Sequence, residues 1–134
     1  MKFRYRRFDN HLRPVIPLKV RHGARAITYS ALVDSGADSC IFDIQVAEEL
    51  GIDLAKNGTL ARVGGIAGQT AMYFIHPVTI EVGGWPLEVQ AGFLALPAGM
   101  FNYGVVGHEG FFEHFVVTFD VVKEEIELKQ RQKV

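Results

Sequence analysis

The apolar positions of the chain fall into short runs rich in Val, Ile, Phe and Tyr, and glycines separate these runs. β-branched and aromatic residues favour strands, and glycine-bounded runs of this length are typical of strands joined by tight turns. The pattern therefore predicts a mainly β fold. The expected strands span residues 15–20, 25–33, 60–63, 70–75, 78–82, 87–94, 104–106, 115–121 and 125–129.

Turn and helix signals fit between these strands. Gly83-Gly84 predicts a hairpin between residues 78–82 and 87–94, because glycine adopts the positive φ that tight hairpin turns require. A helix is expected over residues 44–50, with Asp43 as its N-cap and Gly51 as its left-handed C-terminal stop. A second short helix is expected over residues 108–114. The mixed-charge residues 123–133 predict an exposed strand with a frayed tail.

Length and composition point to one folded domain. The chain has 134 residues, of which 49% are hydrophobic and 22% are charged. This balance supports a core and does not resemble a disordered chain. The formal net charge is -1, so no global field favours nucleic acid or an anionic membrane. We therefore expect a single domain over residues 1–134, with no nucleic-acid or membrane partner.

Cys40 is the one cysteine of the sequence. A single cysteine excludes an internal disulfide and a cysteine-based zinc cage, and it suits a reducing compartment. Residues 1–8 alternate basic and aromatic side chains and lack the apolar run of a signal peptide, and no stretch has the roughly 18 apolar residues of a spanning helix. These features predict a cytoplasmic protein.

Candidate chemistry begins at Asp34, which ends the apolar run of residues 30–33 and opens a tight Asp-Ser-Gly turn. A carboxylate at the end of a buried strand is costly unless it is used. Taken alone, the tripeptide also fits an aspartate that caps its own turn through its side chain. Both interpretations remain open on these three residues.

The wider tract of residues 31–38 resembles the active-site loop of the retroviral-type (retropepsin-like) aspartic proteases, which reads apolar-apolar-Asp-[Ser/Thr]-Gly-Ala. Two further tracts follow in the order that this family has. Residues 63–68, Val-Gly-Gly-Ile-Ala-Gly, resemble the glycine-rich tip of the family's flap, and residues 103–107, Tyr-Gly-Val-Val-Gly, resemble the element before its C-terminal helix. The resemblance covers roughly residues 14–120, which leaves residues 1–13 and 121–134 as terminal extensions.

The resemblance implies a closed, barrel-like β fold with a flap hairpin, and it assigns roles to residues. Asp34 matches the catalytic aspartate, Ser35 the hydroxyl residue that ties two such loops together, and Gly36 the position where substrate backbone comes close. The implied substrate-binding residues are Ala37, Asp38, Gly64, Gly65, Ile66, Ala67 and Gly68. Gly107 and His108 match structural supports of the loop, and no metal or cofactor is implied.

The family needs two Asp-[Ser/Thr]-Gly loops in each active site, and this sequence has one. The resemblance therefore implies a homodimer with two-fold symmetry, in which each chain supplies one Asp34. The implied activity is that of an aspartic endopeptidase on polypeptides. Leu32, Ile66, Val105 and Val106 are candidate walls for apolar side chains of the substrate. A non-catalytic dimeric peptide-binding or scaffold domain of the same fold is the alternative.

One position departs from the family pattern. The residue after Gly107 is commonly an arginine that pairs with the acid matched by Asp38, and here it is His108. We expect His108 to face Asp38 as a shorter, pH-sensitive donor.

Other groups of residues fit chemistry less well. His108-Glu109 and His114 lack the His-Glu-x-x-His spacing of zinc proteases, and Cys40 suits a small buried residue better than a nucleophile. The glycines of residues 65–68 also fit an RNA-binding Gly-x-x-Gly clamp, but the basic surroundings are missing. The basic and aromatic residues 3–8 fit either a nucleic-acid contact or an edge or interface strand, and we favour the strand.

Overall fold

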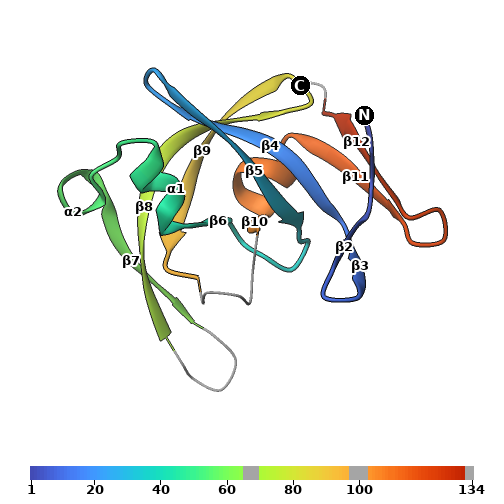
Figure 1. Cartoon of the computed structure of the whole chain (residues 1–134), viewed down its shortest axis with the longest axis horizontal. Helices are drawn as coiled ribbons and strands as arrows, with labels where there is room; N and C mark the ends of the chain where they lie inside the picture. The colour runs from blue at the N-terminus through green and yellow to red at the C-terminus, as the bar shows by residue number, and fades with distance from the viewer. Residues whose placement is uncertain (65–69, 97–102, 132–134) are drawn as a thin grey trace.

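The computed structural model describes residues 1–64, 70–96 and 103–131. Within this part of the chain strands predominate over short helices, so the expected mainly β class is confirmed (Figure 1). The helices are α1 (Ile44–Glu49) and α2 (Leu54–Asn57), and a short helical segment covers His108–Phe112. The strands are β1 (Lys2–Arg4), β2 (Arg6–Phe8), β3 (His11–Arg13), β4 (Val15–His22), β5 (Arg25–Val33), β6 (Cys40–Asp43), β7 (Thr59–Gly64), β8 (Thr70–Val82), β9 (Trp85–Leu94), β10 (Gly104–Val106), β11 (Phe115–Asp120) and β12 (Glu125–Gln130).

The largest sheet closes into a barrel. Its strand order is β4-β5-β10-β6-β9-β8-β7, and a further pairing of β4 with β8 joins the first six strands into a ring. Most pairs are antiparallel, but β10 runs parallel to β5 and β6 runs parallel to β9. The side chains that fill the barrel include Val20, Phe42, Ile80 and Phe93, none of which is exposed. The expected closed, barrel-like architecture is therefore confirmed.

The expected hairpin and first helix are both present. Gly83 and Gly84 have φ values of +54° and +87°, and the strands beside them pair as Val82 with Trp85. At α1 the carboxylate of Asp43 accepts a hydrogen bond from the backbone N–H of Gln45, and Gly51 has a φ of +74° beyond the end of the helix. Local turn and capping chemistry thus predicted these elements correctly.

Two expected elements differ in the structure. Residues 70–75 and 78–82 form one continuous strand, β8, although Pro77 lies in its middle. At Pro77 the strand pairs with β9 alone, so the missing N–H can face the side that has no neighbour. The expected helix over residues 108–114 is short and interrupted, because Glu109 has an extended ψ of 121° and Gly110 a φ of +92°.

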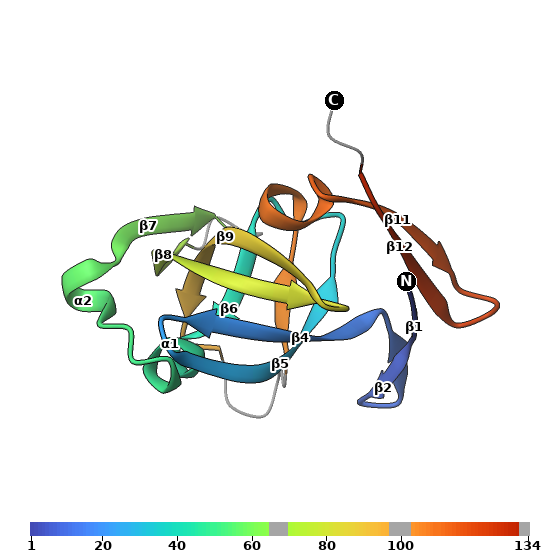
Figure 2. The same cartoon turned by 90° about the horizontal axis from the view of Figure 1, so that it is seen from above.

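The two chain ends form a second sheet of order β1-β12-β11 (Figure 2). We expected residues 123–133 to form an exposed strand, and this was wrong for one face of β12. Ile126 and Leu128 are 0% and 1% exposed, and both belong to the hydrophobic core. β1 pairs with the free edge of β12, so residues 2–4 form an edge strand. The edge or interface strand expected over residues 3–8 is divided between β1 and β2, which belong to different sheets. The described part of the chain contains no helix that is long and apolar enough to cross a membrane.

Candidate active site

Asp34 lies at the carboxyl end of β5, which pairs with β4 and β10 in the barrel. Val33, which precedes it, is 2% exposed, whereas the carboxylate-bearing Asp34 itself is half-buried. The backbone is fixed on both sides, because the N–H of Val33 donates to the carbonyl of Pro14 at 2.9 Å and the N–H of Asp34 donates to that of Val106 at 3.1 Å. A rigid strand end therefore positions the acid at the surface of the barrel.

The turn after Asp34 is closed by the aspartate itself. Its Oδ1 accepts a hydrogen bond from the N–H of Gly36 at 2.8 Å, and its carbonyl accepts one from the N–H of Ala37 at 3.2 Å. This is the self-capping aspartate turn that the tripeptide alone allowed. This turn is compatible with a chemical role for Asp34, because the bond to Gly36 involves one of the two carboxylate oxygens.

Gly107 and the two residues after it pack against the turn that follows Asp34. β10 pairs in parallel with β5, and the segments that follow these two strands are also hydrogen-bonded to each other. The N–H of His108 donates to the carbonyl of Ala37, and the N–H of Glu109 donates to that of Asp38, both at 2.9 Å. A Cβ atom on Gly107 would lie 2.5 Å from the Ala37 carbonyl oxygen and 2.7 Å from that of Ser39. Only glycine allows this close approach of the two backbones.

The side chain of His108 differs from our expectation. Its Nε2 lies in hydrogen-bonding contact with the carbonyl oxygen of Ser35, so that nitrogen carries the hydrogen and donates. Within the described residues no ion pair joins His108 to Asp38. The backbone hydrogen bond from the His108 N–H to the Ala37 carbonyl holds this residue against the turn that contains Ser35. The His108 ring thus contacts a backbone carbonyl of the loop and not the Asp38 carboxylate.

The candidate wall residues differ in burial according to the face of the strand on which each lies. Leu32 and Val105 are partners in the β5–β10 pair and are both half-buried, so they form an apolar pair on one face next to Asp34. Val106 is 0% exposed and belongs to the core, so its expected role as a wall was wrong. Successive residues of a strand point to opposite faces, and Val105 and Val106 cannot both face the surface.

The predicted flap falls at the end of a described hairpin. β7 and β8 pair in antiparallel fashion up to the partners Gly64 and Thr70. Two strands therefore flank the glycine-rich tract, as a flap hairpin requires. Gly65, Ile66, Ala67 and Gly68 themselves lie outside the described residues.

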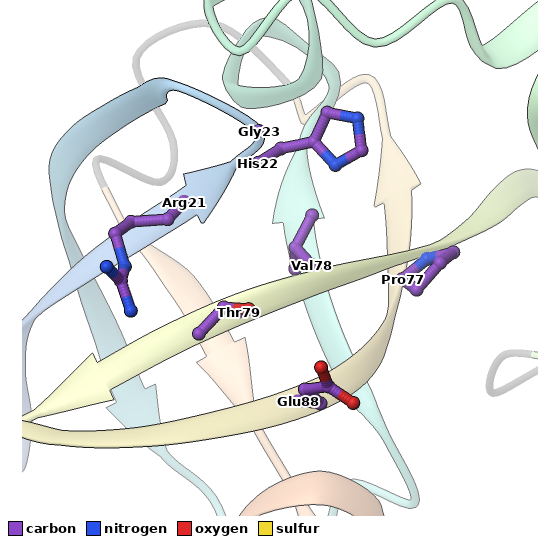
Figure 3. Close-up of a pocket in the computed structure, with 7 residues that line it drawn as sticks. All are labelled: Arg21, His22, Gly23, Pro77, Val78, Thr79 and Glu88. Carbon is purple, nitrogen blue, oxygen red and sulfur yellow. The ribbon is translucent and has the colours of Figure 1, made fainter.

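One cavity bordered by described residues lies away from Asp34. It has a volume of about 440 Å³ and lies between the end of β4 and strands β8 and β9. Figure 3 shows Arg21 and His22 on one side of it and Glu88 on the other. No three potential metal ligands converge among the residues that the structure describes.

Comparison with known proteins places this arrangement in a family. Residues 16–109 match the profile of a family described as aspartyl protease. The chain belongs to the aspartyl protease family.

A solved structure agrees with this assignment at the level of the fold. The EIAV protease in complex with the inhibitor HBY-793 aligns with a TM-score of 0.56 at 20% sequence identity, over 76% of this chain and 88% of that one. A search of curated proteins found no match. The retropepsin-like fold expected from the three sequence tracts is thus confirmed.

Two long-range hydrogen bonds near this candidate site were not predicted from the sequence. Pro14 accepts the hydrogen bond from Val33, and Tyr29 accepts one at its hydroxyl from the N–H of Asp43 at 3.2 Å. Burial raises the pKa of the Tyr29 hydroxyl, which keeps it neutral and able to bridge β5 to the start of α1. No local sequence pattern marks either contact, because both join segments distant along the chain.

Cys40, which follows the Asp34 loop, is 0% exposed, and its thiol has a raised pKa. Burial raises that pKa from its ordinary value of 9.0 to about 11. At pH 8 the thiolate fraction is then about a hundredfold smaller in the folded than in the unfolded chain. We expect alkylation by iodoacetamide at pH 8 to be at least that much slower for the folded protein, as followed by mass spectrometry.

The same raised pKa predicts how stability depends on pH. The folded state holds the thiol proton more tightly, so the contribution is complete below pH 9 and is lost as the pH rises toward 11. The thermal stability of Cys40→Ala should therefore fall less steeply over this range than that of the wild type. Fast alkylation of the folded chain would contradict this account of a buried, inert cysteine.

Proposed function

We propose that this chain is an aspartic endopeptidase that acts as a homodimer, with Asp34 of each copy facing the other across a two-fold axis. The observation that carries the proposal is the position of Asp34. It ends a buried strand, its backbone is hydrogen-bonded on both sides, and no cation lies in an ion pair with it among the described residues. Membership of the aspartyl protease family supports this role for the acid.

Two copies of Asp34 about 3 Å apart would share one proton, because both cannot ionise comfortably at that distance. The charged carboxylate would then take a proton from a bound water, while the protonated one donates to the carbonyl oxygen of the scissile peptide. Titration would belong to the pair rather than to either residue. Each copy already holds its own acid rigid through Gly36, so little reorganisation is needed on assembly.

The neighbouring residues would complete the site in this proposal. Ser35 is exposed, which leaves its hydroxyl available to the loop of the second copy. A substrate in extended form would add as a strand between the loop around Asp38 and the flap of residues 64–68. Leu32 and Val105 would contact apolar substrate side chains next to the scissile bond.

Incubation with a degenerate peptide library tests the proposal. We expect wild-type protein to cleave internal peptide bonds at about pH 4–7, where a shared proton can exist, as detected by mass spectrometry. Statine-type transition-state analogues should inhibit the cleavage and EDTA should not. Specific peptide binding without any cleavage would instead assign the chain to the non-catalytic scaffold class.

A further inference from the structure

The charges of the chain are unevenly distributed along it. Residues 1–13 contain five of the 14 Lys and Arg residues and one of the 15 Asp and Glu residues, namely Asp9. The remaining 121 residues therefore hold nine cations and 14 acids, so a basic N-terminal segment precedes an acidic body. This segment contains the β2–β3 hairpin of residues 6–13, which we call the basic hairpin.

The basic hairpin is anchored to the barrel. Asp9 and Asn10 form its turn with φ values of +49° and +63°, a conformation that both residue types tolerate. The ring of Phe8 packs edge-on against Tyr103 at 4.8 Å between centroids. A guanidinium nitrogen of Arg6 donates to the hydroxyl of Ser30 at 2.7 Å, and the group lies 5.3 Å from the Phe8 ring centre.

Arg6 and Arg13 are direct partners across the hairpin. Directly opposed residues share a face with Cβ atoms roughly 5 Å apart, and like charges in that position destabilise a strand pair. Neither guanidinium has an ion pair among the residues that the structure describes. The hairpin thus holds two positive charges together at a cost in stability, and the contacts of Arg6 with the Ser30 hydroxyl and the Phe8 ring neutralise neither charge.

The same face of the hairpin borders the candidate active site. Arg13 ends β3, and the next residue, Pro14, accepts the hydrogen bond from Val33, which precedes Asp34. Tyr103, which contacts Phe8, leads directly into β10, the parallel neighbour of β5. Figure 1 shows the hairpin beside the carboxyl end of β5. Arg7 and Leu12 lie on the opposite face and are exposed.

We propose that Arg6 and Arg13 bind an acidic side chain of the polypeptide substrate and so direct cleavage to bonds near Asp or Glu. This inference rests on the proposed peptidase function. A carboxylate matches the geometry, because two guanidinium groups can hold its two oxygens through charge-assisted hydrogen bonds. Binding would also relieve the repulsion within the pair, and that gain is specific to an anion.

A peptide carboxylate fits this surface better than a nucleic acid does. Nucleic-acid sites need an extended basic stripe, whereas the pair is confined to one face of a hairpin that has three residues in each strand. The acidic remainder of the chain would repel a long polyanion. A single acidic residue in an otherwise neutral peptide meets neither obstacle.

Paired peptide substrates test this inference. A peptide cleaved by the wild type is prepared with Glu, and then with Gln, at each position within five residues of the scissile bond. We expect kcat/KM to be higher for Glu by about tenfold or more at one position, as for a charge-assisted hydrogen bond. The double variant Arg6→Gln/Arg13→Gln should lose this preference and cleave the Gln peptide as the wild type does.

A charge-matched control isolates the pair from net charge. Lys2→Gln/Arg7→Gln removes the same two charges from exposed positions outside the Arg6–Arg13 face and should keep the preference. Circular dichroism and thermal melting confirm that both variants fold. Raising the salt concentration should weaken the wild-type preference and leave cleavage of the Gln peptide unchanged.

The possible negative results distinguish failure of this inference from failure of the proposed peptidase function. Equal cleavage of Glu and Gln peptides by the wild type, or an unchanged preference in Arg6→Gln/Arg13→Gln, would overturn the inference and leave the peptidase intact. Absence of any cleavage by the wild type would remove both proposals together. Binding of single-stranded RNA or of phosphatidylserine vesicles that requires Arg6 and Arg13, without a peptide preference, would assign the pair to that polyanion instead.

Discussion

Asp34→Asn is expected to lower the peptidase activity by at least about a thousandfold, because an amide can neither accept the water proton nor share a proton with the second copy. The fold should survive, since the amide oxygen of asparagine can still accept the hydrogen bond from the Gly36 N–H. The measurement is cleavage of a quenched fluorescent peptide, alongside circular dichroism and analytical ultracentrifugation.

Asp53→Asn provides the matched control. It makes the same chemical change at the N-cap of α2, where the Asp53 side chain accepts a hydrogen bond from the N–H of Lys56 at 3.2 Å. Asparagine caps a helix about as well as aspartate, so activity and stability should both be retained. Cleavage by highly purified Asp34→Asn protein at a rate close to that of the wild type would exclude Asp34 as the catalytic acid.

The elements that local chemistry determines could be predicted from the sequence. The Gly83-Gly84 hairpin, the Asp43 cap of α1 and the strand that ends at Asp34 all depend on neighbouring residues, and all are present. α2 is a local element that we missed, although Asp53 supplies its cap. A helix of four residues produces no periodic pattern that could distinguish it from a turn.

The features that could not be predicted depend on pairing between distant segments. β1 pairs with β12 near the other end of the chain, and this pairing determines which face of β12 is buried. The partner of His108 is set by the register of two backbones, so the family pattern pointed to Asp38 while the ring contacts Ser35. The predicted role of Val106 was wrong for a related reason, because a shift of one residue along a strand exchanges core and surface positions.

A mixed-chain experiment would test whether one site needs two copies of Asp34. The wild type is mixed with nine parts of Asp34→Asn, exchanged under mild dissociating conditions, and then returned to assay conditions. If only dimers with two aspartates are active, one dimer in a hundred is competent, and activity per wild-type chain falls about tenfold. If each chain carries its own site, activity per wild-type chain stays constant.

The control for exchange and dilution is nine parts of Asp53→Asn in place of Asp34→Asn. This chain can pair with the wild type and retains Asp34, so the total activity should equal that of undiluted wild type at the same total concentration. A fall in both mixtures would reveal loss of protein during exchange, and ultracentrifugation would measure it. The sequence contains one Asp-Ser-Gly loop, so we expect the squared dependence on the wild-type fraction that a site shared by two chains requires. A linear dependence would show instead that a single chain, with one Asp34, carries the whole reaction.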